Sequence, residues 1–182
     1  MKESHFIQSV EELGQQYTAP LSSSTGKVKK ALSPAMIRWL TFSPFFVLSS
    51  ISEDGIDCSP RGDLPGDTFR VLDEHTIAIP DRRGNNRVDT LKNIITDPRV
   101  GLVFLIPGIE EALRIKGSAR ISIAPELLQA FALNDELPAT VMLISVQSAY
   151  VQNARAIRAA RLWDKTADIA LQTVPTAHDL YE

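Results

Sequence analysis

The sequence contains a single cysteine, Cys58, among its 182 residues. One cysteine excludes an intramolecular disulfide and any cysteine-rich zinc motif, and it is typical of a protein from a reducing compartment. No apolar run approaches the length of a membrane span, and the first residues, MKESHFIQSVEEL, lack the apolar stretch of a signal peptide. We therefore expect a cytoplasmic protein with no membrane segment.

The chain also lacks an excess of positive charge. It has 19 Lys and Arg against 22 Asp and Glu, which gives a formal net charge of −3. Such a chain has no general basic field that would attract nucleic acid, so any anion site must be local. The three histidines, His5, His75 and His178, share no spaced motif with one another or with Cys58, and we expect no metal site.

The glycine fingerprint of dinucleotide-binding folds and the P-loop are absent as well. Hydrophobic residues make up 44% and charged residues 23%, as in an ordinary globular protein. At this length we expect a single domain over residues 1–182. Residues 1–32 are expected to form a helical and loop extension, and residues 164–182 a C-terminal tail.

Stretches rich in β-branched and aromatic residues dominate the chain between residues 45 and 151 and indicate strands. They read FFVLSSI, IDCSPRG, FRVLD, TIAIP, VGLVFLIP, EALRIKGSARISI and ATVMLISVQSAYV. An Asp-Gly turn signal, EDG, joins the first two as a hairpin. Five or six strands connected mainly by hairpins, with a few short helices at the corners, predict a mainly β protein built as an antiparallel barrel.

Short helices are predicted in five places. Ser33-Pro34 provides an N-cap followed by proline at the first helical position, and this helix should end near Ser43-Pro44. In RVDTLKNII, Val88, Leu91 and Ile95 recur at helical spacing before Asp97-Pro98 stops the pattern. The remaining candidates are SVEELGQQY, PELLQAFAL and NARAIRAARLW.

The connection between the strand TIAIP and the helix RVDTLKNII is unusually rich in cations and amides: residues 79–93 read IPDRRGNNRVDTLKN. We expect Asn86 to cap a helix that begins at Arg87, with Asp89 as the reciprocal capping residue. The helix start offers unpaired N–H groups, and Arg82, Arg83 and Arg87 offer bidentate donors, so a phosphate would fit there. Equally, these arginines could pair only with acids such as Asp81 and Asp89.

Two further arginines occur in strand contexts. Arg61 lies in SPRGDLPGD, directly after the strand that follows the hairpin turn, where the local alternative is a pair with Asp63. Arg114, in ALRIKG, points to the opposite face from Leu113 and Ile115, and an outward arginine on a half-exposed strand is usually solvated.

Taken in order, SPFFVLSS, EDGIDCSPRGDLPGD, VLDEHTIAIPDRRGNNRVDTLKNIITDPRVGLVFLIPG and LRIKGSARI resemble the flavin-binding family related to pyridoxamine 5′-phosphate oxidase. The resemblance covers about Phe6 to Trp163. It implies a split antiparallel β-barrel of the FMN-binding type that forms a homodimer, with FMN at the subunit interface and both subunits lining each cleft. It also implies that the FMN phosphate is bound by residues of two segments: Arg61, Arg82, Arg83, Asn85, Asn86 and Arg87.

The segment AYVQNARAIRAARLWD, from Ala149, resembles the closing motif of the same family. By that resemblance Arg155, Arg158 and Trp163 match the family pattern, and Arg114, Arg155 and Trp163 are further candidates for cofactor binding. Many relatives carry His-Cys where this chain has Gln152-Asn153, which leaves the chemical role of that pair open. On its own, NARAIRAARLW is an amphipathic helix with solvent-facing arginines.

By resemblance, the expected function is that of an FMN-binding flavoprotein, an oxidoreductase with no catalytic residue assigned. FMN would carry the electron chemistry, and the protein would supply position and access. Pyridoxamine 5′-phosphate is not the expected substrate, because members with that activity end in a basic segment with Arg and His, whereas this chain ends LQTVPTAHDLYE. The alternative is a non-catalytic flavin-binding or sensory protein.

Overall fold

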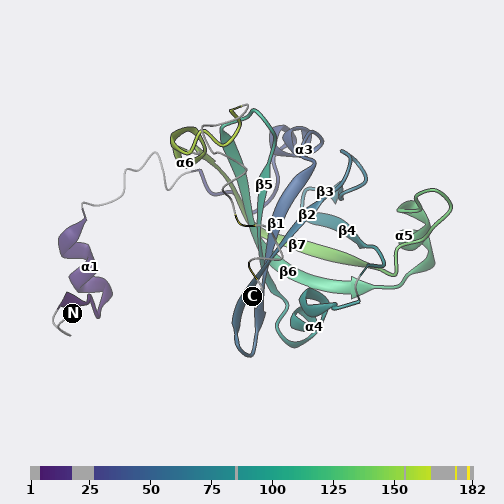
Figure 1. Cartoon of the computed structure of the whole chain (residues 1–182), viewed down its shortest axis with the longest axis horizontal. Helices are drawn as coiled ribbons and strands as arrows, with labels where there is room; N and C mark the ends of the chain where they lie inside the picture. The colour runs from purple at the N-terminus through teal and green to yellow at the C-terminus, as the bar shows by residue number, and fades with distance from the viewer. Residues whose placement is uncertain are drawn as a thin grey trace.

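The computed structural model describes residues 5–17, 27–84, 86–153, 155–164, 175 and 180. Within these ranges seven strands form one antiparallel sheet in the order β2-β1-β5-β6-β7-β4-β3, which is strongly twisted and curled (Figure 1). The strands are β1 (Phe45–Ser52), β2 (Gly55–Gly62), β3 (Arg70–Asp73), β4 (Thr76–Asp81), β5 (Arg99–Leu105), β6 (Glu111–Ser122) and β7 (Thr140–Asn153). The helices are α1 (Val10–Gln16), α3 (Pro34–Leu40), α4 (Asp89–Thr96), α5 (Pro125–Ala130) and α6 (Arg155–Ala159).

All seven predicted stretches form strands, so the sheet has seven strands rather than the five or six expected. β3, within the stretch FRVLD, is only four residues long and pairs with β4 at the sheet edge. The last strand is also longer than predicted, since β7 continues through Gln152 to Asn153 and pairs with the start of β6.

The core lies on the inner face of the curled sheet. In β1 the residues alternate between half-buried and buried, as expected of a strand with one face packed. Phe46, Phe69 and Phe104 meet at its centre, with ring centroids 4.9 to 5.8 Å apart. Leu32, at the end of the predicted extension, is only 3% exposed and belongs to this core. The packed body of the protein therefore begins before residue 33.

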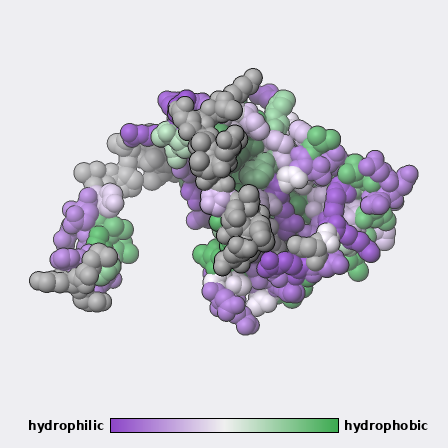
Figure 2. All heavy atoms as spheres, viewed as in Figure 1, coloured by the Kyte–Doolittle hydropathy of each residue, from purple (hydrophilic) through white to green (hydrophobic). Residues whose placement is uncertain are grey.

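Two N-terminal helices begin as the sequence predicts. Ser9 caps α1 by accepting a hydrogen bond from the Glu12 N–H, and Ser33 caps α3 by accepting one from the Met36 N–H. The two helices differ in packing: α3 buries Leu40, whereas α1 has no buried residue. Figure 2 shows hydrophobic residues of α1 on the molecular surface.

The predicted cap of α4 is wrong. The helix begins at Asp89 rather than Arg87, and its N-cap residue is Val88, which makes no side-chain capping bond. Asp89 instead pairs with Arg87, and Asn86 and Val88 both have left-handed backbones, with φ of 57° and 50°. A β-branched residue rarely adopts this conformation, which costs on the order of 1–3 kcal/mol. The backbone before α4 is therefore strained.

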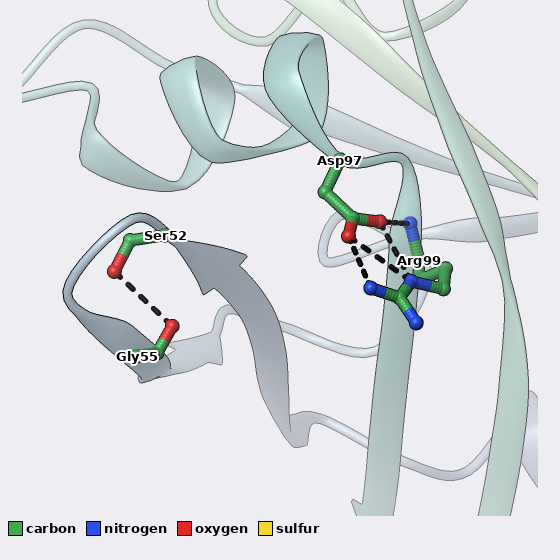
Figure 3. A network of polar contacts seen from close by, with 4 residues as sticks. All are labelled: Ser52, Gly55, Asp97 and Arg99. Atoms are coloured by element: carbon green, nitrogen blue, oxygen red, sulfur yellow. Dashed lines mark hydrogen bonds and ion pairs between the residues drawn. The ribbon is translucent and has the colours of Figure 1, made fainter.

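Asp97 is the C-cap residue of α4. Figure 3 shows Ser52 and Gly55 in the β1–β2 turn, and Asp97 with Arg99 where α4 passes into β5. The Asp97 carboxylate accepts from the Arg99 backbone N–H at 3.0 Å and from its Nε at 2.9 Å. The side-chain and backbone hydrogen bonds from Arg99 lower the pKa of Asp97 to about 2.

Candidate functional site

A pocket of about 560 Å³ lies where β2, the end of β4 and the start of α4 meet. Most of the predicted phosphate-binding residues line it. Its lining comprises Asp57, Cys58, Ser59, Pro60, Arg61, Asp81, Arg82, Arg83, Gly84, Asn86, Arg87, Val88, Asp89, Thr90, Leu91, Ala139 and Thr140. Four arginines and three aspartates give this lining a small positive excess in a protein whose net charge is −3. The pocket is thus a local site of the kind that a net acidic chain needs to hold an anion.

Arg61 reaches the pocket from β2, one of the two edge strands of the described sheet. Its Nη1 donates a hydrogen bond to Asp81 Oδ1 at 3.1 Å, and the two side chains are 29% and 13% exposed. Arg61 therefore pairs with Asp81 and not with Asp63, the alternative partner that the sequence suggests. The Nε of Arg61 is buried and has no hydrogen-bond partner among the described residues.

Thr140, which the sequence analysis missed, provides a second buried polar atom at this pocket. It is the first residue of β7 and lies directly opposite Asp81 in the β4–β7 register. Its Oγ1 is buried and finds no hydrogen-bond partner in the part of the chain that the structure describes. Nothing in the local sequence marks a threonine at the start of a strand as functional. Only the sheet order, which places β7 beside β4, brings it to Arg61 and Asp81.

The three arginines of the segment between β4 and α4 differ in their hydrogen-bond partners. The Nη1 of Arg82 donates to the Phe131 carbonyl at 3.1 Å, and its Nε lies 3.9 Å from Asp63 Oδ2. The Nε of Arg87 donates to Asp89 Oδ2 at 2.9 Å in an exposed pair. Arg87 thus pairs with Asp89, as the alternative reading of the sequence predicts. Arg83 is exposed and has no ion-pair or hydrogen-bond partner among the described residues.

The two asparagines of this segment have different outcomes. Asn86 lines the pocket but does not cap α4. Asn85 falls outside the described residues.

The remaining predicted residues form a second cluster, at the end of β7 away from the pocket. Arg114 donates from Nη1 to Gln152 Oε1 at 3.1 Å, and its guanidinium lies 5.3 Å from the centre of the Tyr150 ring. The Gln152 side chain is thus bound by Arg114.

The closing motif is fixed to the loop between β5 and β6. Trp163 Nε1 donates to the Ile109 carbonyl at 2.9 Å, and Arg158 pairs with Glu110, whose pKa it lowers by hydrogen bonding. Arg155 begins α6 and is exposed.

The two clusters are far apart within one chain. Thr140 is at the start of the 14-residue strand β7 and Gln152 is near its end. At about 3.3 Å per residue, the clusters are separated by on the order of 40 Å along the strand. Arg114, Arg155 and Trp163 therefore do not line the Arg61 pocket of their own chain.

No group of three or more potential metal ligands occurs among the described residues. No helix in the described part of the chain has the length and apolarity to cross a membrane.

The sequence model of pyridoxamine 5′-phosphate oxidase matches residues 32–164. The chain belongs to the pyridoxamine 5′-phosphate oxidase family. The match begins at Leu32, the first buried core residue described, and ends just after Trp163. Among curated proteins, none matches the sequence.

Several solved structures share the fold. HupZ of Group A Streptococcus has a TM-score of 0.55 at 13% identity, covering 68% of this chain and 96% of its own. A Lactobacillus delbrueckii protein named as a pyridoxamine 5′-phosphate oxidase has a TM-score of 0.53 at 17% identity, covering 67% and 95%. General stress protein 26 of Bacillus anthracis has a TM-score of 0.51 at 16% identity, covering 65% and 92%. The predicted mainly β split barrel is confirmed.

Proposed function

We propose that this protein binds FMN, with the flavin phosphate in the Arg61 pocket, and that it is an oxidoreductase. The observation that carries the proposal is the pair of buried polar atoms without partners, Arg61 Nε and Thr140 Oγ1, which belong to residues lining one pocket. Unsatisfied buried polar groups are rare in native proteins, and each costs about 1–3 kcal/mol. A ligand with several acceptor oxygens would satisfy both.

A phosphate fits this donor set. Arg61 offers an unused N–H, Thr140 offers a hydroxyl, and α4 begins at the pocket with the unpaired N–H groups of its first turn. The Asp81 carboxylate fixes the Arg61 guanidinium at 3.1 Å, so the anion need not order that side chain on binding. Arg87 adds positive charge at the rim, although its bond to Asp89 makes it a weaker candidate than Arg61.

Electron transfer would be the chemistry of the flavin itself, and this chain's residues would bind and orient the cofactor. Membership of the pyridoxamine 5′-phosphate oxidase family supports this class of activity.

We further propose that the protein works as a homodimer. The Arg114, Arg155 and Trp163 cluster lies at the opposite end of β7 from the Arg61 pocket, so both can serve one flavin only if they come from different chains. Light scattering at micromolar concentration with flavin bound should give the mass of two chains. A single-chain mass with flavin still bound would contradict the shared site.

The proposal is tested by the visible absorption spectrum of the purified protein and by identification of the chromophore released on denaturation. We expect a flavin spectrum and released FMN, at about one per chain. A colourless protein that takes up no added FMN would refute the proposal. Bleaching of the bound flavin by a nicotinamide cofactor, with steady turnover, would establish a reductase or oxidase, whereas an unreactive flavin would indicate a passive flavin-binding protein.

A further inference from the structure

A second, smaller pocket lies beside the Arg61 pocket and shares two residues with it. It has a volume of about 310 Å³, at the lower end of the ~300–1,000 Å³ typical of ligand pockets. Its lining consists of Arg82, Arg83, Leu133, Asn134, Glu136 and Leu137. Arg82 and Arg83 border both cavities, so a group bound in one lies next to a group bound in the other.

A tight hairpin turn forms one wall of this second pocket. Leu133 and Glu136 exchange two backbone hydrogen bonds of 3.0 Å each. The two residues between them, Asn134 and Asp135, have φ of 50° and 64°, as in a type I′ turn. This tight hairpin follows Phe131, whose carbonyl accepts from Arg82 Nη1 at 3.1 Å. Arg82 is therefore a positioning residue that ties the hairpin to the end of β4.

Two opposite charges on this pocket have no partner within the described ranges of the chain. Arg83 has no ion-pair or hydrogen-bond partner among the described residues, and neither has the carboxylate of Glu136. Arg82, in contrast, is engaged by Phe131 and lies near Asp63. The pocket thus presents a free cation, a free acceptor and the aliphatic side chains of Leu133 and Leu137.

We infer that this second pocket binds an adenosine phosphate group. Arg83 would bind the phosphate, because a guanidinium donates to phosphate oxygens through two N–H groups. Glu136 would accept from ribose hydroxyls, the role that acidic side chains fill in many nucleotide sites. The base would lie against Leu133 and Leu137. The inference extends the proposed flavin site, since Arg83 stands between the two pockets.

Such a group has two chemical sources. It is the adenylate half of FAD, in which a second phosphate follows the flavin phosphate directly. It is also one half of a nicotinamide dinucleotide, which would approach a bound FMN as a separate electron donor.

Calorimetric titration with adenosine 5′-monophosphate tests the pocket on flavin-free and FMN-loaded protein. We expect Arg83→Ala to weaken binding of this probe by about tenfold, the loss of one charge-assisted contact. Glu136→Gln should weaken it about threefold. The matched controls, Arg120→Ala and Glu126→Gln, replace exposed residues on β6 and α5 and should change nothing. Equal affinity in the wild type and all four variants, or no binding to the wild type, would overturn the inference.

Comparing FMN, FAD and NADH separates the two sources. If the pocket holds the adenylate of FAD, Arg83→Ala lowers FAD affinity about tenfold and FMN affinity much less. If it holds part of a nicotinamide donor, the FAD to FMN ratio stays constant and NADH affinity for FMN-loaded protein falls. If neither changes, the inference is wrong. Failure of the flavin proposal would look different, because FMN would not bind while the adenosine phosphate titration on flavin-free protein would still respond to Arg83→Ala.

Discussion

Arg61 and Asp81 are 20 positions apart in the chain, yet they form the partly buried ion pair on which the pocket is built. The sequence predicts Arg61 as a phosphate-binding residue, with Asp63, its near neighbour in SPRGD, as the alternative partner; in the structure Arg61 lines the pocket and pairs with Asp81. β2 and β4 are not neighbours in the sheet, so this pairing follows from the curl of the sheet, which no local pattern encodes. Thr140 was missed because only the β4–β7 register places it opposite Asp81.

Replacing Arg61 with alanine should affect both binding and folding. FMN affinity should fall roughly tenfold to a few hundredfold, as expected for one lost charge-assisted contact. Because Asp81 is only 13% exposed, its unpaired carboxylate should also lower the free energy of unfolding by about 2 kcal/mol. Calorimetry and urea denaturation measure the two effects.

Two comparisons make this prediction specific. The double variant Arg61→Ala/Asp81→Asn should regain most of the stability and none of the affinity. Arg87→Ala removes an exposed pair and should change stability by less than ~1 kcal/mol. Unchanged FMN affinity in both Arg61→Ala and Arg87→Ala would place the phosphate elsewhere.

Thr140→Val should move stability and binding in opposite directions. The valine removes a buried hydroxyl that has no partner, so the flavin-free protein should become more stable by ~1 kcal/mol, while FMN affinity drops about tenfold. Thr68→Val is the matched control, because the Thr68 hydroxyl is buried and donates to the Pro44 or Leu64 carbonyl. The free energy of unfolding of Thr68→Val should fall by ~1 kcal/mol. Loss of stability in Thr140→Val would mean that its hydroxyl is already satisfied.

At the level of elements, periodicity and turn chemistry predicted nearly every strand and helix, because strands with one buried face and capped helices leave local marks. The predicted cap at Ser33 is confirmed, and Ser9, at the start of the first predicted helix, caps α1. The start of α4 was not predictable from local signals. Asp89 forms an ion pair with Arg87 instead of capping the helix, and Asn86 and Val88 adopt left-handed backbone conformations. Strain of this kind is common at functional sites.

The β6–β7 pair depends on Gly117, which lies at a bulge next to Lys116. A Cβ at this position would lie 2.3 Å from the Ser145 carbonyl oxygen. We expect Gly117→Ala to lower the free energy of unfolding by about 1–3 kcal/mol. Gly101→Ala, in the neighbouring strand β5, is the control, since its Cβ would meet only Ser49 Cβ at 3.9 Å. Equal thermal midpoints for the two variants would contradict the tight approach of these strands.

The junction of α4 and β5 should be sensitive to acid through Asp97. Its pKa is lowered to about 2 from an ordinary value of 3.8, so its contribution to stability is complete above about pH 4 and is lost as the pH falls toward 2. Asp97→Asn should therefore be less stable than the wild type by a constant amount from pH 5 to 7. In thermal melts the difference should shrink below pH 4, and a pH-independent difference would argue against the Arg99 interaction as its cause.

At the scale of the whole molecule, the fold was predictable and the complete site was not. The family resemblance and the strand pattern predicted a split barrel, and Arg61, Arg82, Arg83, Asn86 and Arg87 do gather at one pocket. Arg114, Arg155 and Trp163 lie at the other end of β7, where they bind Gln152 or the β5–β6 loop or are exposed. The sequence does not give the distance between the Arg61 segment and the closing motif. Within one chain the two lie at opposite ends of β7.

The account rests on a phosphate bound by Arg61 and Thr140, and a calorimetric comparison of FMN with riboflavin tests it most directly. The two ligands share the ring system and differ in the phosphate. With charge-assisted bonds worth roughly 1.5–3 kcal/mol each, FMN should bind at least about a hundredfold more tightly than riboflavin. Equal affinities for the two would contradict the central claim.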